Sequence, residues 1–512
     1  MTKALQQEQM PVRSSRVRIK NELGQAQTLA SGPEQFLGFG QGKHLLLLGL
    51  GPDPHVLTGL IPEDQDVYYL EAPGFLSQMP PTWRTRIPSA WRDLRPEEIN
   101  LNLVTRGRVL FYRRNLRLFP SFWGPIWAKC EWLRLHPQKT QQSKKAIWIP
   151  AKVEDLLVPE LTHAFREIGF EVSHLPPSRM HEFLLKHLAQ VHPQVLLSIN
   201  FSGLDPYGEC FYLLKQADVP VVVWCVDNPF HLLTGLKSSF WKEVWLMVTD
   251  PWFIQPLRQH GARRVLYLPL AACPEVFQPS SSSHEHDLKG RLVFVGRSEF
   301  PRKEGFFSAC KLPHLVWEDA KKMLDQGRRP DFSWWQKRLG NDSLWPGQQV
   351  RQVGFGAEQS SRAWRTLCLK EAAKHLPLTV FGDSNWSNLL PESAEIWGEV
   401  DYYGPLAGIY GQAEYTLNTT SLLLPRGLTQ RHFDVWAAGG FLITDATPGL
   451  ELFPEELAGE ISFDHPGHVS SVLNNLERDS SLRSDLQQAW RKLILTSHTY
   501  RQRVETIMDW VE

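Results

Sequence analysis

Several features that would place a chain in a special class are scarce in this sequence of 512 residues. It has only six cysteines, with no CxxC pair and no cysteine and histidine at the spacing of a zinc site. We therefore expect reduced, mostly buried thiols. The basic residues (Lys and Arg) number 55 and so do the acidic ones, so the net charge is zero and indicates no nucleic-acid partner.

Long apolar runs are also missing. Residues Met1–Lys20 are polar and mixed in charge, without the apolar segment of a signal peptide, and no uncharged apolar run of about 18 residues occurs elsewhere. We therefore expect a cytoplasmic protein with no membrane span. A basic, aromatic stretch at 106–135 is interpreted as the cationic face of an ordinary helix, with a membrane surface or an anionic partner as the alternative.

What is present is the pattern of a large α/β protein. The chain is too long for one hydrophobic core, and about 150 residues per domain suggests about three domains. From Ala146 to Leu270, apolar runs recur at helix-sized intervals, which indicates a parallel sheet covered on both faces, as in a doubly wound Rossmann-like domain. The predicted strands begin at Ala146, Phe170, Val195, Val219, Val244 and Val265.

Polar segments divide the chain. A serine-rich stretch at 279–290 predicts a linker, and a second set of strands begins at Arg291 and continues to Asp445. The predicted units are a loosely ordered leader (to about residue 35) with a small α/β lobe within 1–143, Rossmann-like domains at 144–280 and 291–479, and terminal helices at 480–512 that pack back on the body.

The residues directly after the predicted strands are the first candidates for chemistry. Ligands of open parallel sheets bind at the carboxyl ends of the strands, and two such domains facing each other create a cleft. The strand Arg291–Gly296 is followed by Arg297, Arg302 and Lys303, a set of cations that suits a diphosphate. A solvated basic loop is the alternative interpretation.

The segment Leu423–Asp445 is the most informative single stretch. It is interpreted as a glycine-containing loop, a short helix, a Gly-Gly stop and a buried strand. The free N–H groups of the helix start are expected to hold nucleotide phosphates against Gly427–Gln430. One turn further on, Asp434 is expected to accept hydrogen bonds from ribose hydroxyls, although an aspartate in a helix is usually only a surface residue.

Candidates for the acceptor side follow strands of the first Rossmann-like domain. Asp227 or His231 is predicted to act as a general base on an acceptor hydroxyl in an inverting reaction. For Asp227 an equal alternative is a turn-forming Asp-Asn-Pro whose carboxylate caps the next helix. Asn200, Asn228 and Asp250 occupy similar positions after strands.

These motifs together resemble the group 1 glycosyltransferases, and in particular their CgeB-like branch. The resemblance covers about residues 145–512, and the residues that carry it are Gly296-Arg297, Arg302-Lys303, Tyr403-Gly404-Pro405, Asn418, Leu428–Arg431, Phe433-Asp434, Gly439-Gly440, Asp445 and, in the first domain, Val222–Pro229. It implies a GT-B fold, with the acceptor in the first Rossmann-like domain, a nucleotide-sugar in the second, no metal ion and no cofactor.

The resemblance and the positions after strands together assign the donor site. The predicted residues are Arg297, Arg302, Lys303, Arg426, Gly427, Leu428, Thr429, Gln430, Arg431 and Asp434. Group 1 enzymes commonly carry two glutamates separated by seven residues, whereas this chain has Arg426 and Asp434 at that spacing. The ribose role carries over to Asp434, while Arg426 is expected to contact phosphate instead of sugar.

The sequence leaves three functions open. A sugar transferase needs a donor pocket and an open acceptor cleft, and its acceptor is a protein, a glycan or a small molecule that the sequence does not identify. A nucleotide-sugar epimerase on the same architecture is the second candidate, and the additional lobe argues mildly against it. The third is a catalytically degenerate module that binds a glycan or a partner, which the arginine at position 426 favours.

Overall fold

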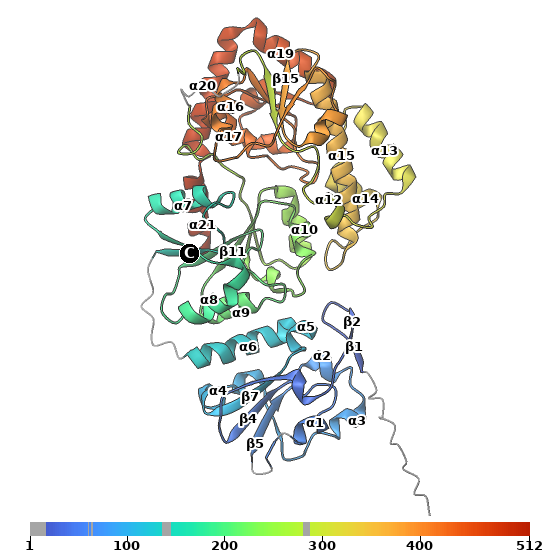
Figure 1. Cartoon of the computed structure of the whole chain (residues 1–512), viewed down its shortest axis with the longest axis vertical. Helices are drawn as coiled ribbons and strands as arrows, with labels where there is room; N and C mark the ends of the chain where they lie inside the picture. Colours follow the sequence, from blue (N-terminus) through green and yellow to red (C-terminus); the bar gives the residue numbers. More distant parts are fainter. Residues whose placement is uncertain (1–16, 60, 63–64, 136–144, 280–286) are drawn as a thin grey trace, which may run out of the picture.

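The computed structural model describes residues 17–59, 61–62, 65–135, 145–279 and 287–512. Three α/β units follow one another along the molecule: an N-terminal lobe, a first Rossmann-like domain and a second Rossmann-like domain (Figure 1). The predicted linkers at 137–145 and 279–290 fall largely outside the described residues. None of the helices in the described ranges has the length and apolarity needed to cross a membrane.

The N-terminal lobe is built around a five-stranded sheet. Only its first edge strand, β3, is antiparallel to its neighbour. In spatial order the strands are β3 (Phe36–Phe39), β7 (Gly107–Tyr112), β4 (His44–Leu48), β5 (Asp66–Leu70) and β6 (Arg92–Asp93). The helices of the lobe are α1 (His55–Thr58), α2 (Pro73–Leu76), α3 (Pro81–Arg84), α4 (Leu101–Thr105), α5 (Asn115–Leu118) and α6 (Pro120–Leu135).

Two predictions for this lobe need correction. The described part of the expected loose leader, residues 17–35, contains a hairpin of β1 (Arg18–Lys20) and β2 (Ala26–Thr28), because Ile19 and Leu29 are buried in the core of the lobe. The basic stretch is a helix as predicted only in its second part, α6, which lies between the lobe and the next domain (Figure 1); its first part contains the interior strand β7. Its Gly124 faces the Tyr212 ring so closely that an added Cβ would lie 2.2 Å from it.

The first Rossmann-like domain has an all-parallel sheet of six strands, as predicted. In spatial order these are β13 (Arg264–Tyr267), β12 (Trp245–Val248), β11 (Val221–Cys225), β10 (Val195–Ile199), β8 (Ala146–Ile149) and β9 (Glu171–His174). Numbered within the domain, the first five strands have the doubly wound order 2-1-3-4-5. Its helices are α7 (Val158–Glu167), α8 (Met180–His187), α9 (Glu209–Gln216), α10 (Pro229–Leu233) and α11 (Ile254–Gln259).

The second Rossmann-like domain also has six parallel strands. They are β16 (Glu395–Trp397), β15 (Leu378–Phe381), β14 (Leu292–Val295), β17 (Tyr415–Asn418), β18 (Leu442–Asp445) and β19 (Ser462–Phe463) in spatial order. Numbered within the domain this is 3-2-1-4-5-6, the order of the Rossmann fold. The helices are α12 (Lys303–Phe306), α13 (His314–Asp325), α14 (Phe332–Arg338), α15 (Gln349–Ala372), α16 (Leu406–Gln412), α17 (Arg431–Ala437), α18 (Glu455–Ile461), α19 (Val469–Arg478) and α20 (Ser480–Ser497). The two facing sheets confirm the predicted GT-B architecture.

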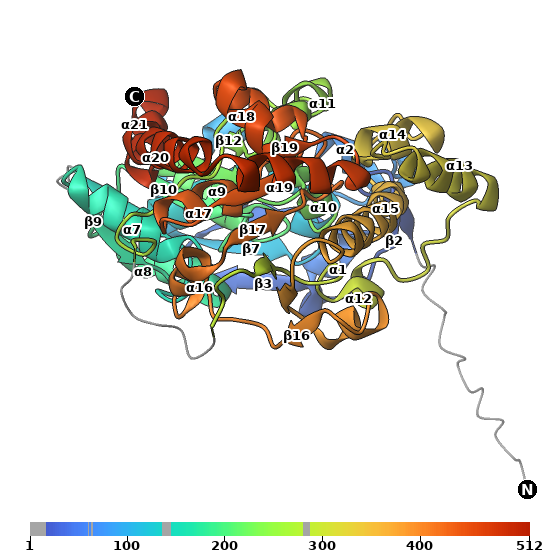
Figure 2. The same cartoon turned by 90° about the horizontal axis from the view of Figure 1, so that it is seen from above.

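Two helices join the Rossmann-like domains. Helix α15 packs Val350 and Val353 into the core of the first domain and, further along, Trp364 and Cys368 into the core of the second. On another side of the molecule, the last helix, α21 (Tyr500–Val511), leaves the second domain and packs against α7 of the first (Figures 1 and 2). The predicted terminal helices therefore divide between the two bodies, since α20 packs on α17 of the second domain.

Candidate functional site

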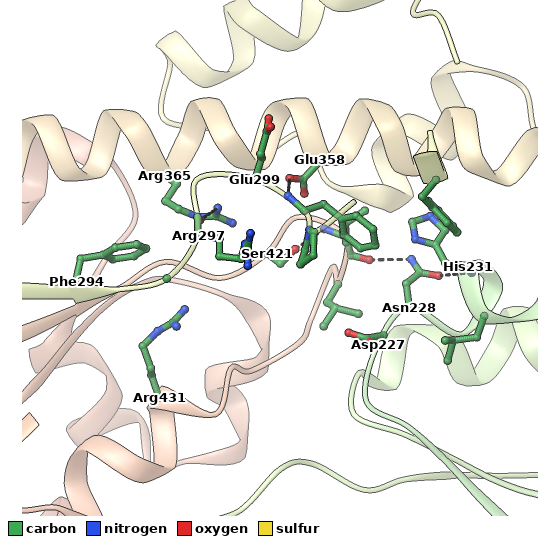
Figure 3. A pocket seen from close by; sticks show the side chains of 17 residues that line it. Asp227, Asn228, His231, Phe294, Arg297, Glu299, Glu358, Arg365, Ser421 and Arg431 are labelled. Carbon is green, nitrogen blue, oxygen red and sulfur yellow. Dashed lines mark hydrogen bonds between the residues drawn. The ribbon is translucent and has the colours of Figure 1, made fainter. Parts of the chain in front are cut away.

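A cavity of about 370 Å³ lies between the two Rossmann-like domains, at the carboxyl ends of their strands. The first domain contributes residues that follow β11, and the second contributes residues that follow β14 and β17 together with side chains of α15 and α17 (Figure 3). Charged or polar side chains at the cavity are Asp227, Asn228, His231, Arg297, Glu299, Glu358, Arg365, Ser421 and Arg431.

The strand order explains why the cavity is there. In the second domain β14 and β17 are neighbours in the sheet, but they are the first and fourth strands along the chain. Their following loops leave in opposite directions, so a crevice opens between them, and this switch point is where open α/β sheets bind ligands. The loop after β14 is fixed on both sides, because Ser298 N–H and Oγ donate to Asp383 and Phe300 N–H donates to Glu358.

Two arginines face this crevice without an acidic partner. The Arg365 Nη1 on α15 donates to the carbonyl oxygens of Arg297 (2.6 Å) and Ser298 (3.1 Å). Arg431 on α17 donates from Nε to Asn418 Oδ1 (2.7 Å) and from Nη1 to the carbonyl oxygen of Val295 (2.7 Å). Within the described residues, neither guanidinium forms an ion pair.

Burial lowers the pKa of both guanidinium groups, which nonetheless stay protonated because arginine is too basic to lose its proton in a protein. Figure 3 shows Arg365 and Arg431 on opposite sides of the same opening. A cation removed from water normally forms an ion pair with a carboxylate, so two guanidiniums without an ion pair and with donors left over favour an anionic ligand.

Other charges of the second domain are balanced within the protein. Arg297 lines the cavity as predicted, but its Nη1 is 2.9 Å from Glu399 Oε1 and its side chain is half exposed. Glu358 is 2% exposed and its Oε1 accepts the Phe300 N–H at 2.6 Å. Burial raises the pKa of Glu358, an effect opposed by nearby Arg365. Arg365 and Arg431 are therefore the cations available to a ligand.

Asp227 enters the cavity from the first domain. It follows β11, where the sequence places it, and its carboxylate Oδ2 accepts a hydrogen bond from Asn200 Nδ2 at 2.8 Å. The surrounding protein raises the pKa of Asp227, while the Asn200 amide opposes that shift. The side chain that caps the following helix is Asn228, whose Oδ1 accepts the N–H groups of Phe230 and His231, so Asp227 is not held by a capping role.

His231 also lines the cavity, but it is 6% exposed and packed among the rings of Phe306, Phe307 and Phe332. Burial, helped by nearby Arg351, lowers the pKa of His231 to about 3. Its buried Nε2 has no hydrogen-bond partner among the described residues. The imidazole is therefore neutral and weakly basic, and Asp227 is the stronger base at this cavity.

Three predicted donor-site cations lie away from the cavity. Arg302 is exposed and does not line it, and the Lys303 Nζ pairs with Glu299 Oε2 at 2.8 Å. Arg426 also does not line it; its guanidinium pairs with Glu451 and its backbone N–H donates to Asp250 of the first domain. The loop after β14 turns before it reaches residue 302, so cations in that loop are not all on one face.

The predicted phosphate loop and ribose ligand are occupied by contacts within the protein. Leu428 belongs to the core, Thr429 Oγ1 donates to Asn418 Oδ1, and Gln430 Nε2 donates to the Ala271 carbonyl oxygen of the first domain; of Gly427–Gln430 none lines the cavity. Asp434 is 1% exposed, and its two carboxylate oxygens accept hydrogen bonds from Tyr402 and Gln430. Burial raises its pKa well above the ordinary range. In this geometry Asp434 presents no free carboxylate to a ribose.

Sequence reasoning missed Arg365 and Glu358, both on α15. They are two helical turns apart in a helix with no recognisable motif, and they reach the cavity only because α15 crosses the carboxyl edge of the sheet. The only signal available was an arginine on the buried side of an amphipathic helix. Asn418 was noted as a family residue, but its part in orienting Arg431 emerges only from the fold.

Part of the second Rossmann-like domain matches a known family. Residues 362–509 match the family model described as glycosyl transferase-like, a region that includes Arg365, Asn418 and Arg431. No curated protein matches the chain. The enzyme class indicated by the family match is a glycosyltransferase.

Several solved structures are similar to the chain at low identity. T4 phage BGT in complex with UDP and Mn²⁺ is 10% identical, with 72% of this chain and 99% of that chain covered and a TM-score of 0.40. An alpha-glucosyltransferase in complex with UDP-glucose and DNA containing an abasic site is 12% identical, with coverage of 72% and 98% and a TM-score of 0.41. A trehalose-6-phosphate synthase is 11% identical, with coverage of 91% and 98% and a TM-score of 0.34.

Proposed function

We propose that this protein transfers a sugar from a nucleotide-sugar to the hydroxyl group of an acceptor, without a metal ion, as expected for the CgeB-like branch of the group 1 glycosyltransferases. The observation that carries the proposal is the pair of guanidiniums without an ion pair, Arg365 and Arg431, at the switch point between β14 and β17. The diphosphate of the donor lies against this pair.

The reaction begins with the acceptor hydroxyl on the side of the first domain. Asp227 accepts the hydroxyl proton while the oxygen forms a bond to the anomeric carbon of the sugar. The bond between that carbon and the diphosphate breaks, and the nucleoside diphosphate leaves with the electron pair. Arg365 and Arg431 stabilise the negative charge that develops on it, which is the role that a metal ion plays in other transferases. A single displacement of this kind inverts the anomeric configuration.

The acceptor is a protein, a glycan or a small molecule with a free hydroxyl group. The cavity supports an acceptor distinct from the donor because its two walls come from different domains, with the base on one wall and the cations on the other. An epimerase would instead close such a cleft around a single substrate and would need no separate acceptor.

The proposal is tested first by donor binding. Thermal stability of the purified full chain is measured in EDTA with UDP-, GDP-, ADP-, CMP- and dTDP-sugars. We expect one nucleotide class to stabilise the wild type, and Arg365→Gln and Arg431→Met to lose that stabilisation. Arg302→Ala is the matched control, because Arg302 neighbours the same loop without lining the cavity. No stabilisation by any donor, or an effect only in Arg302→Ala, would refute the proposal.

Turnover then separates a transferase from a binding module. Slow release of free sugar from the bound donor in water is expected from the wild type, and a protein that binds a donor but never cleaves it would instead be a non-catalytic module. Full activity in EDTA is expected. A rate that depends on an added divalent ion, with no change in the thermal stability of the donor-free protein, would contradict the metal-free mechanism.

A further inference from the structure

A second cavity, of about 200 Å³, lies on another side of the molecule between α7, the segment after β13 and the beginning of α21. It shares no lining residue with the cavity of the cleft. Five of its side chains carry atoms that bind metal ions. In three of them these atoms lie close together: His163 and Glu167 on α7, and Glu275 in the segment that leaves the first domain. The other two are Glu160 and Cys273, whose Sγ donates to Glu275 Oε2 at 3.3 Å. The proposed transfer reaction uses none of them.

The three ligating groups converge. His163 and Glu167 are four residues apart on α7 and therefore lie on the same face of the helix. The His163 Nε2 is 3.3 Å from Glu275 Oε1 and 3.9 Å from Glu167 Oε2, and the three ligand atoms all lie within 4.8 Å of one another. A tetrahedral ion with bonds of about 2.0 to 2.1 Å separates its ligand atoms by about 3.3 Å, so small side-chain rotations bring this set to binding geometry.

A fourth group in the same cavity lacks a partner. Glu160, one turn before His163 on α7, is 0% exposed and lines the cavity. Its Oε2 accepts a hydrogen bond from Tyr403 at 2.8 Å, but its buried Oε1 has no hydrogen-bond partner in the described part of the chain. Leaving a buried carboxylate oxygen unsatisfied is costly, so this atom points to a donor that binds in the cavity.

We propose that His163, Glu167 and Glu275 bind a divalent transition-metal ion, with a water molecule on the ion donating a hydrogen bond to Glu160 Oε1. Imidazole with two carboxylates suits Zn²⁺ and similar ions, whereas Mg²⁺ and Ca²⁺ prefer oxygen ligands only. Three protein ligands leave one tetrahedral position for the water. Glu160 is then a positioning residue, because it acts through that water.

The proposed ion links α7 to the segment 272–275, in which the chain leaves the first domain toward the second. That segment also pairs with the start of α21, since Ala272 and Thr499 form a parallel bridge. The proposed ion therefore stabilises the place where three parts of the chain meet, and it does not contact Arg365, Arg431 or Asp227.

The test is a Zn²⁺ titration of the full chain after treatment with a chelator and desalting, followed by calorimetry. We expect the wild type to bind one Zn²⁺, and Co²⁺ to give the intense visible absorption of a tetrahedral site. His163→Asn and Glu275→Gln are expected to weaken Zn²⁺ binding by more than about 100-fold. Glu160→Gln is expected to weaken it by about 10- to 100-fold, the effect of losing an outer hydrogen-bond partner.

The chain offers a matched control for the helical pair. His314 and Glu318 have the same spacing on α13, with 3.6 Å between their ligand atoms, but they belong to no cluster of three ligands among the described residues. His314→Asn should therefore bind Zn²⁺ as the wild type does, and unchanged circular dichroism would show that each variant is folded. Absence of stoichiometric binding in the wild type, or equal binding in His163→Asn and Glu275→Gln, would overturn the proposal.

Discussion

Replacing Arg431 by methionine distinguishes the effect of this residue on the stability of the fold from its effect on donor binding. The guanidinium donates two hydrogen bonds, to Asn418 and to the Val295 carbonyl, and lies 5.7 Å from the centre of the Phe294 ring. Arg431→Met loses these contacts but removes a buried charge that has no acidic partner among the described residues. Because buried charges are often replaced by apolar groups at little cost, we expect the free energy of unfolding to change by less than about 1 kcal/mol.

The effect of this substitution on the affinity for the donor should be much larger. A hydrogen bond to a charged group contributes about 1.5 to 3 kcal/mol, so donor binding should weaken by about 10- to 150-fold. At a donor concentration of about 100 times the wild-type Kd, binding stabilises the wild type by about 2.7 kcal/mol. At the same concentration the variant should gain only about 0.3 to 1.4 kcal/mol.

The assay is urea unfolding of both proteins, with and without the donor identified in the thermal screen. Arg329→Met is the matched control, since Arg329 is also partly buried in the second domain but lies 3.5 Å from the fully buried Asp445. Breaking that pair should cost about 3 to 5 kcal/mol and leave the gain from donor binding unchanged. If Arg431→Met instead loses stability as Arg329→Met does and keeps the full gain from the donor, Arg431 is a structural residue and the reasoning is wrong.

Three further substitutions test the cleft and its surroundings. Asp227→Asn should lower kcat by about 100- to 10,000-fold without changing the stabilisation by the donor, and normal turnover in the variant would exclude Asp227 as the base. Because the surrounding protein raises the pKa of Asp227, the wild-type kcat should begin to fall with decreasing pH above the usual titration range of an aspartate. Gly354→Ala places a Cβ 2.0 Å from His231 Nε2 and should lower the free energy of unfolding by about 1 to 3 kcal/mol. Gly459→Ala in α18 is the control, because its added Cβ meets open space and should not lower that free energy. Equal urea unfolding curves for the two variants would contradict the close packing of Gly354 on His231. Burial raises the pKa of Asp434 in the folded state, so the contribution of this group to stability is present at low pH and is lost as pH rises above the ordinary pKa of an aspartate. The stability of Asp434→Asn relative to the wild type should therefore increase as pH rises from about 4. A difference that stays constant with pH would contradict the raised pKa.

The fold of the Rossmann-like domains was predictable because their strands are continuous apolar runs. Strands such as Val195–Ile199 and Val221–Cys225 are buried on both faces, so each is visible as an uninterrupted hydrophobic segment. The N-terminal lobe was less visible. Strand β7 begins with Gly107 and Arg108 in a basic context, and the hairpin of β1 and β2 is short and mostly polar, so only tertiary packing distinguishes either from a loop.

Residues of the cavity were predictable only where they come directly after the ends of strands. Asp227, His231 and Arg297 were found because each comes shortly after a buried strand, and the structure places all three at the cavity. Arg365 was missed because it reaches the cavity from the middle of a long helix, whose distance from the sheet is invisible in the sequence. For Asp434, spacing along a motif does not show that the carboxyl group already accepts hydrogen bonds from Tyr402 and Gln430.

The attachment of the two Rossmann-like domains by both α15 and α21 limits how they can move. Two helices that cross from one body to the other at separate places favour one motion, a rotation about the line that passes through both. Sliding of one domain along the other, or twisting about the long axis of the molecule, would strain at least one of the helices. The cleft should therefore open and close like a hinged book, so that one angle describes every state between donor entry and product release.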